Sequence, residues 1–218
     1  YRNKIVYDSG SDDPDRILIM ADRDLLNELV NHRNIFGDGT FSSCPRIFFQ
    51  LYTLSIEINR TFIPCIYILL RTKTTVIYVK MIRAIRTIVP AFNPQTIMLD
   101  YEKAVINAFQ QECIGIEIKA CFFHLNQSLN RKIAAVGLKT DYENIQDVKI
   151  LFRSLASLAF VPVNDIVFVF DELCTIFPQE IPHQRVLKYF QNTYIESEDG
   201  GPPVFPPRFW NQYDACLR

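Results

Sequence analysis

The stretch that decides the fold is Ile35-Phe36-Gly37-Asp38-Gly39-Thr40-Phe41. Apolar residues lead into it, and two of the seven glycines of the chain flank its single acid, Asp38. Glycine weakens the interior of a strand and often marks a close approach of another backbone or of a ligand. A tight turn is the alternative, because glycine and aspartate are both common turn residues. The sequence on either side of this stretch is needed to distinguish a strand from a tight turn.

Apolar runs with two different periods follow. The stretches 35–41, 47–58 and 60–71 are separated by short polar gaps. This spacing predicts three consecutive strands that pair antiparallel. Apolar residues then recur at helical spacing until Pro90. The later pattern predicts a strand at 96–100, a helix at 103–113, a strand at 116–123 and a helix at 124–136. This order predicts an α/β protein with a mixed sheet covered on both faces by helices.

The two ends of the chain differ from this central part. Residues 17–20 predict a short edge strand, and residues 22–31 predict a helix with Asp22 as its N-cap. Residues 138–195 have a mainly helical pattern, whereas the segment after them is rich in glycine, proline and acids. We therefore divide the chain into an N-terminal lead-in with a helix (1–31), a core (32–137), a helical insertion (138–195) and an irregular segment (196–218).

The composition argues against several classes of protein. The 218 residues carry 23 Lys and Arg against 24 Asp and Glu, a net charge of -1. This balance is untypical of a basic protein that coats nucleic acid and of an acidic disordered one. The most apolar stretch, residues 62–70, is too short to cross about 30 Å of hydrocarbon, so we expect no membrane span. Six cysteines, several beside apolar runs, favour reduced thiols in an intracellular protein.

A second acid, Asp100, follows an apolar strand and precedes a helix. Ligands of open α/β sheets bind at the carboxyl ends of strands, although a plain N-cap aspartate fits the same place. If this strand lies parallel to the strand of Asp38, the two carboxylates are neighbours on one face. Adjacent carboxylates repel unless a cation lies between them. A pair of Mg²⁺ or Mn²⁺ ions ~3.5–4 Å apart can drive phosphodiester chemistry at such a site.

Three blocks of sequence occur in order and at suitable spacing. They are Asp38-Gly39-Thr40-Phe41, Leu99-Asp100-Tyr101-Glu102-Lys103-Ala104 and Cys121-Phe122-Phe123-His124-Leu125-Asn126-Gln127. Their combination resembles the catalytic domain of Mutator-like element (MULE) transposases, from about Ile35 to Arg218. The resemblance implies an RNase H-like fold, in which a mixed five-stranded sheet is flanked by helices and a helical insertion precedes the C-terminal end. The lead-in resembles members that carry an upstream FLYWCH-type zinc finger.

The resemblance also implies roles for single residues. Asp38 matches the first acid of the family's DDE triad and Asp100 the second, and both are expected to bind the metal. The third acid of the family is a glutamate on a helix after the insertion, and we expect it beyond Arg218. Substitutes within the chain are Glu172, Glu196 and Glu198. Without the third acid, we expect this fragment to lack strand-transfer activity.

Cys121 and His124 form a C-x-x-H pair that recurs in the family. Structural zinc is held by four ligands, and the spacing of Cys44, Cys113 and His183 does not complete such a set. We therefore do not expect zinc in this fragment, and we interpret the pair as a buried thiol and a hydrogen-bonded imidazole. The family resemblance implies a second role for His124, near the active centre.

The resemblance implies the function as well. The chain is expected to be a fragment of the catalytic core of a nuclear DNA transposase, which cleaves and joins transposon ends and target DNA with Mg²⁺ or Mn²⁺. Assembly as a homo-oligomer is a further implication. The alternative is a domesticated or degenerate transposase-derived module that binds DNA or protein without catalysis. Another RNase H-like nuclease is a third hypothesis.

Overall fold

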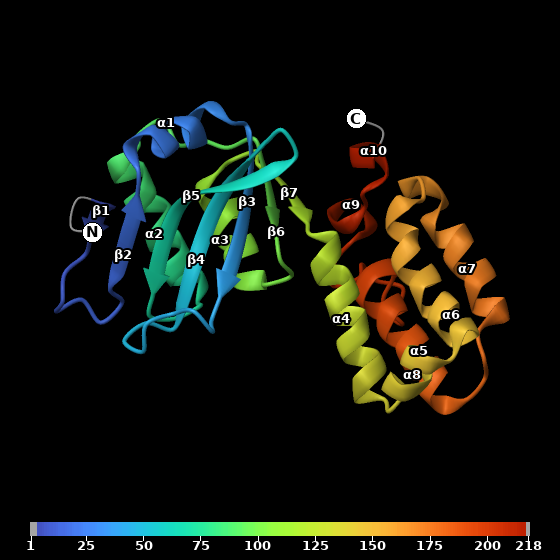
Figure 1. Cartoon of the computed structure of the whole chain (residues 1–218). Helices are drawn as coiled ribbons and strands as arrows, with labels where there is room; N and C mark the ends of the chain where they lie inside the picture. The colour runs from blue at the N-terminus through green and yellow to red at the C-terminus, as the bar shows by residue number, and fades with distance from the viewer. Residues whose placement is uncertain (1–3, 217–218) are drawn as a thin grey trace. The chain divides into compact units, whose positions relative to one another are not determined.

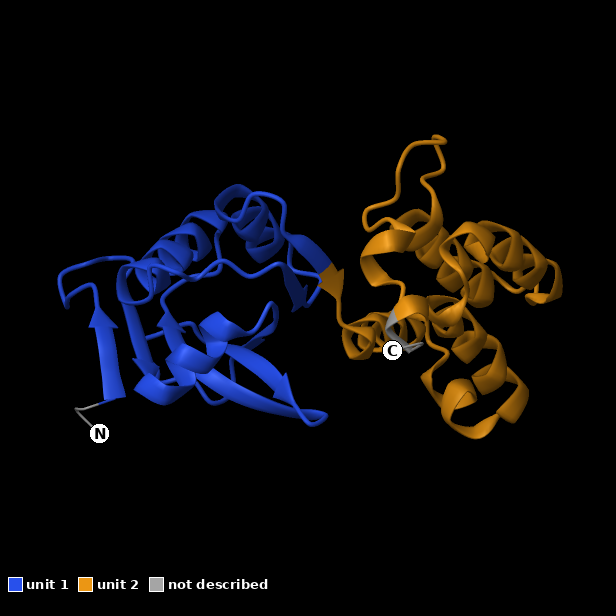
Figure 2. Cartoon of the chain, turned by 90° about the horizontal axis from the view of Figure 1, so that it is seen from above, with its two compact units in different colours: residues 1–118 blue, residues 119–218 orange. Residues whose placement is uncertain are grey.

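The computed structural model describes residues 4–216, and the chain divides into two compact units with the boundary between Ile118 and Lys119 (Figure 2). The first unit holds most of the β-sheet and the second is helical (Figure 1). The functional division that we predict at residues 31, 137 and 195 stays a prediction.

A mixed sheet of seven strands organises the first unit (Figure 1). The strands are β1 (Ile5–Asp8), β2 (Ile17–Ala21), β3 (Asn34–Thr40), β4 (Gln50–Ile58), β5 (Thr61–Leu70), β6 (Thr96–Leu99) and β7 (Glu117–Ala120), which crosses the unit boundary. Their order in space is β1-β2-β5-β4-β3-β6-β7. The predicted antiparallel pairing of β3, β4 and β5 is confirmed, as is the α/β class.

The expected number of five strands is wrong, because two N-terminal strands extend the sheet beyond β5. β2 pairs antiparallel with β5 from Ile17 opposite Leu70 to Ala21 opposite Ile66, and β1 pairs with β2. β2 is therefore not an edge strand. Both strands are only four or five residues long. Such short runs carry little periodicity, and their place depends on partners far along the chain.

Three helices complete the first unit: α1 (Arg23–Asn31), α2 (Thr75–Ile88) and α3 (Lys103–Glu112). The predicted cap of α1 is confirmed, since the Asp22 side chain accepts a hydrogen bond from the Asp24 backbone N–H. Tyr78 of α2 meets the Tyr52 ring of β4 edge to face, with ring centroids 5.4 Å apart. α2 therefore packs on the sheet face to which Tyr52 points, and α2 in turn contacts α3.

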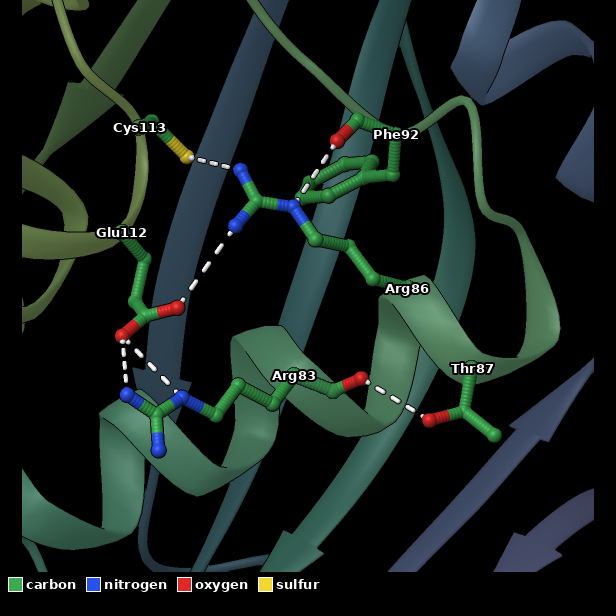
Figure 3. A network of polar contacts seen from close by, with 6 residues as sticks. All are labelled: Arg83, Arg86, Thr87, Phe92, Glu112 and Cys113. Carbon is green, nitrogen blue, oxygen red and sulfur yellow. Dashed lines mark hydrogen bonds and ion pairs between the residues drawn. The ribbon is translucent and has the colours of Figure 1, made fainter.

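A polar network joins α2 to the end of α3 (Figure 3). Both Nε and Nη2 of Arg83 donate to Glu112 Oε1, at 3.1 and 2.9 Å, and Arg86 Nη1 lies 3.6 Å from Glu112 Oε2. Arg86 also donates to the Phe92 carbonyl at 3.2 Å and to Cys113 Sγ at 3.4 Å. These two arginines therefore connect α2 to the C-terminal end of α3.

The second unit is built from helices, as the pattern of residues 138–195 predicts. They are α4 (Phe122–Ala135), α5 (Lys139–Asn144), α6 (Gln146–Ser157), α7 (Ile166–Ile176), α8 (Ile181–Phe190), α9 (Pro207–Trp210) and α10 (Tyr213–Cys216), with short turns η2 (Leu158–Phe160), η3 (Val163–Asp165) and η4 (Gln191–Ile195). Residues 196–206 contain neither helix nor strand, as predicted, whereas α9 and α10 lie within the rest of the segment that we predict to be irregular (196–218).

An aromatic cluster ties the end of the chain to α8. The Trp210 side chain is fully buried and meets the rings of Phe190 and Tyr194 edge to face, with centroids 6.2 and 6.1 Å away. Its indole N–H donates to the backbone carbonyls of Tyr194 at 3.2 Å and Phe205 at 3.1 Å. The core of this unit therefore depends on one residue of the short helix α9.

Candidate active site

Asp38 lies inside a strand and not in a turn. Within β3 it pairs with Thr53 of β4, in the middle of a ladder that continues to Thr40 opposite Leu51. Residue 38 is exposed, whereas Gly37 before it is buried. The strand interpretation of this stretch is therefore confirmed, and the turn alternative is wrong.

Asp100 follows the strand that runs beside β3. β3 and β6 are parallel, and Phe36 lies opposite Met98 in their ladder. Continuing this register by two residues places Asp38 opposite Asp100, and residues in register on neighbouring strands project from the same face. The predicted parallel pairing is confirmed for residues 34–36 of β3 and 96–98 of β6, and its continuation would make the two acids neighbours. The roles of these acids in catalysis and metal binding stay predictions.

Asp100 is not the N-cap of α3, so that alternative is wrong. Glu102 is the N-cap, and its backbone N–H donates to Asp100 Oδ1 at 3.1 Å. Aspartate side chains commonly accept such a bond from the backbone two residues on. The bond orients the Asp100 carboxylate where β6 ends and α3 begins.

The glycines on either side of the first acid make room for side chains of neighbouring strands. A Cβ atom on Gly37 would lie 2.5 Å from Tyr52 Oη and 2.8 Å from Leu99 Cδ2. A Cβ atom on Gly39 would lie 3.0 Å from Gln50 Oε1. The close approach that the glycines predict therefore exists, and it is made by side chains of the protein itself.

Two buried polar atoms beneath these strands, Tyr52 Oη and Gln50 Oε1, have no hydrogen-bond partner among the described residues. Burial raises the pKa of the Tyr52 phenol well above its usual value. The neighbouring Tyr78 and the negative charges of Asp100, Asp38 and Glu102 raise that pKa further. Tyr52 is therefore a neutral phenol next to the acids of the candidate site.

Glu102 belongs to the same group of residues, although its place in the sequence did not by itself predict a role at the site. Its Oε1 accepts a hydrogen bond from Tyr78 Oη at 3.1 Å, and Tyr78 Oη accepts one from Gln50 Nε2 at 2.7 Å. Burial raises the pKa of Glu102 and the charge of Asp100 raises it further, whereas Tyr78 and Lys73 act in the opposite direction. The signal in the sequence that could have indicated this role is a glutamate two residues after Asp100, at the start of a helix.

The donor set suits a hard divalent cation that keeps part of its water shell. Among residues 4–216, no three His, Cys, Asp or Glu side chains lie close enough to hold a metal together. Mg²⁺ is often bound by one or two carboxylates and several waters, so Asp38 and Asp100 fit such an ion. The third acid expected beyond Arg218 lies outside the described residues.

The substitutes for the third acid all lie in the second unit. Glu172 is exposed on α7, and Glu196 accepts a hydrogen bond from Gln191 Nε2 at 3.3 Å. Glu198 lies 2.8 Å from Lys188 Nζ, and the hydrogen bond from this lysine lowers the pKa of Glu198. Glu196 and Glu198 are thus engaged by nearby side chains of the same unit.

Cys121 and His124 also belong to the second unit, where Cys121 is the N-cap of α4. β7 is therefore shorter than predicted and α4 begins earlier, before His124. Burial raises the pKa of the Cys121 thiol, but hydrogen bonds from the His124 side chain and from the backbone N–H groups of His124 and Phe123 outweigh it and lower the pKa overall. The structure therefore pairs the thiol with the imidazole, as we interpret the C-x-x-H, but the Cys121 side chain is half-buried and not fully buried.

The other residues considered for zinc are divided between the units. Cys44 and Cys113 lie in the first unit, and His183 stacks on Phe152 in the second, with ring centroids 5.7 Å apart. The cysteines whose side chains the structure describes are free thiols: Cys44, Cys65, Cys113, Cys121 and Cys174.

The central part of the chain, which contains both acids, is similar to a known protein domain. Residues 35–128 match the MULE transposase domain. The matched MULE segment covers a little under half of the 218 residues and contains Asp38, Asp100, Cys121 and His124. It supports a transposase-related function, and a transposase domain implies an interaction with DNA. None of the curated proteins compared with the chain matches it. Over the described residues, every helix is too short or too polar to cross a membrane.

Proposed function

We propose that this chain is the catalytic core of a DNA transposase that cleaves and joins DNA with Mg²⁺ or Mn²⁺ held by Asp38 and Asp100. The observation that supports the proposal is the parallel register of β3 and β6, whose continuation by two residues places Asp38 opposite Asp100, within the segment that matches the MULE domain. The family's remaining properties follow from the same proposal: a third acid beyond Arg218, a homo-oligomer, an upstream zinc finger and a place in the nucleus.

The sheet topology supports an RNase H-like core within the proposal. Strands β3 to β7 lie in the order β5-β4-β3-β6-β7, in which three antiparallel strands are followed by a strand parallel to β3. We assign these five strands to the RNase H-like core and regard β1 and β2 as an addition at one edge.

In the proposed reaction, the metal ion and the protein side chains have different roles. A divalent ion at the site would activate the attacking water or 3′-hydroxyl and stabilise the leaving oxygen. The chain supplies Asp38 from a strand interior and Asp100 from a turn that Glu102 N–H braces. Two neighbouring carboxylates repel when no cation is between them, so their proximity favours the uptake of a cation.

Asp38→Asn and Asp100→Asn test this proposal, because each removes one negative charge with little change in shape. We expect Mn²⁺ to bind the wild-type chain in a calorimetric titration, and each variant to bind at least about tenfold more weakly, which is about 1.4 kcal/mol. Asp24→Asn on α1 is the matched control and should leave the affinity unchanged. A wild-type chain that takes up no Mn²⁺, or two variants that bind as the wild type does, would refute the proposal.

A second candidate function is a transposase-derived module that binds DNA or protein without catalysis. It is favoured because, among the described residues, no three acids lie close enough to hold one metal ion together. Nicking of supercoiled plasmid by the chain with Mn²⁺ separates the candidates. Nicking that Asp38→Asn abolishes supports the enzyme, and binding of duplex DNA without any nicking supports the module. Cleavage of an RNA–DNA hybrid alone supports another RNase H-like nuclease.

A further inference from the structure

Glu102 is the acid that the proposed chemistry does not yet use. We propose that Glu102 is a positioning residue of the Asp38 and Asp100 site, whose charge strengthens divalent-cation binding and whose side chain, held by Tyr78, steadies the backbone N–H that orients Asp100. This inference rests on the proposed function, because it requires a cation at the two aspartates.

A continuous set of hydrogen bonds leads from the buried face of the sheet to Asp100. Gln50 Nε2 donates to Tyr78 Oη at 2.7 Å, and Tyr78 Oη donates to Glu102 Oε1 at 3.1 Å. The backbone N–H of Glu102 then donates to Asp100 Oδ1 at 3.1 Å. Gln50 and Tyr78 are both 0% exposed, so the donor that holds Glu102 belongs to the packed core. Because Tyr78 holds the Glu102 side chain, the Glu102 backbone N–H that donates to Asp100 is held in place as well.

The charge of Glu102 is not balanced locally. Within the described part of the chain, no Lys or Arg nitrogen lies within 4.0 Å of its carboxylate. Lys73 acts on Glu102 only at longer range, and the charge of Asp100 opposes its ionisation. A divalent ion at the two aspartates would supply the positive charge that this half-buried carboxylate lacks, so the negative charge of Glu102 should strengthen the binding of the ion.

An independent observation links Glu102 to the two aspartates. The Tyr52 hydroxyl is buried, has no hydrogen-bond partner among the described residues and would clash with a Cβ atom on Gly37, the residue before Asp38. The ring of Tyr52 also meets the ring of Tyr78, the residue that donates to Glu102. One buried tyrosine thus packs against both the strand of Asp38 and the residue that holds Glu102. The carboxylates do not form a three-ligand metal site, so Glu102 acts through its charge and position.

The test compares Glu102→Gln with wild type in the full chain by calorimetric Mn²⁺ titration. We expect the variant to bind Mn²⁺ about tenfold more weakly, the lower end of typical effects for groups that support metal ligands. Glu57→Gln, which neutralises an exposed glutamate of β4, is the matched control and should leave the affinity unchanged. Tyr78→Phe keeps the charge at Glu102 and removes only its hydrogen-bond donor, so we expect a smaller loss of about threefold by the same reasoning.

Metal-free stability gives a second readout, which separates this role from a purely structural one. Glutamine has nearly the shape of glutamate and keeps an acceptor for the Tyr78 hydroxyl. In thermal melts with EDTA, we therefore expect the melting temperature of Glu102→Gln to be no lower than that of wild type.

The possible outcomes separate this inference from the proposed function. If wild type takes up no Mn²⁺, or if Asp38→Asn binds it normally, the proposed function fails. If wild type binds Mn²⁺ and Asp38→Asn does not, but Glu102→Gln and Tyr78→Phe both bind with wild-type affinity, only the role of Glu102 is overturned. Weaker binding in Glu102→Gln with an unchanged or higher metal-free melting temperature supports it, since a purely structural role would lower that temperature.

Discussion

Replacing Trp210 with alanine lowers the stability of the second unit by about 3–5 kcal/mol. The side chain is 0% exposed, so alanine leaves a cavity between the rings of Phe190 and Tyr194. It also removes the N–H that serves the carbonyls of Tyr194 and Phe205, and a buried acceptor without a donor costs further free energy. Hydrogen–deuterium exchange of the α4 and α8 backbone amides in the full chain measures the loss.

Two further variants separate the causes. Trp210→Phe keeps most of the apolar volume and removes the N–H, so its loss should be smaller, about 1–3 kcal/mol. Phe168→Ala on α7 is the control, because that ring is 67% exposed and its removal should hardly change exchange. Wild-type exchange rates in Trp210→Ala would show that the aromatic cluster does not hold this unit together.

Gly37→Ala lowers the stability of the first unit by about 1–3 kcal/mol, the usual range for overpacking a filled core. The new Cβ atom would lie 2.5 Å from Tyr52 Oη and 2.8 Å from Leu99 Cδ2, closer than real Cβ contacts. Tyr52 cannot simply move away, because it is 3% exposed and packs on the Tyr78 ring. Urea unfolding of the full chain, followed by circular dichroism, measures the effect.

The variant Tyr52→Phe shows which contact causes the loss of stability in Gly37→Ala. It removes the atom at 2.5 Å and leaves ring carbon Cζ at 3.2 Å, so Gly37→Ala should cost less in that background. Tyr52→Phe alone should be neutral or stabilising by about 1 kcal/mol, because the buried hydroxyl has no partner among the described residues. Gly201→Ala, with no atom within 4 Å of its added Cβ, is the control. Equal costs of Gly37→Ala in both backgrounds would exclude the Tyr52 hydroxyl as the cause.

Local pattern predicted the central strands and helices well, because their periodicity extends over enough residues to be distinctive. β4 and β5 span nine and ten residues, and α2 spans fourteen. The N-cap of α1 was also predictable, since Asp22 and its donor Asp24 are two residues apart. Short elements were harder to place. β1 was not predicted as a strand, and the junction of β7 with α4 lies three residues earlier than expected, at Cys121.

The amino-acid sequence by itself indicated the strand that leads to Asp100 and a strand or turn around Asp38, because strand alternation and helix spacing are properties of consecutive residues. Only the tertiary structure decided that Asp38 lies in a strand beside the one that leads to Asp100, and what surrounds these acids. Gln50, Tyr78 and Glu102 come from three separate elements, and the register of β4 and the packing of α2 and α3 bring them together. No local pattern encodes such contacts, since each depends on where distant segments meet.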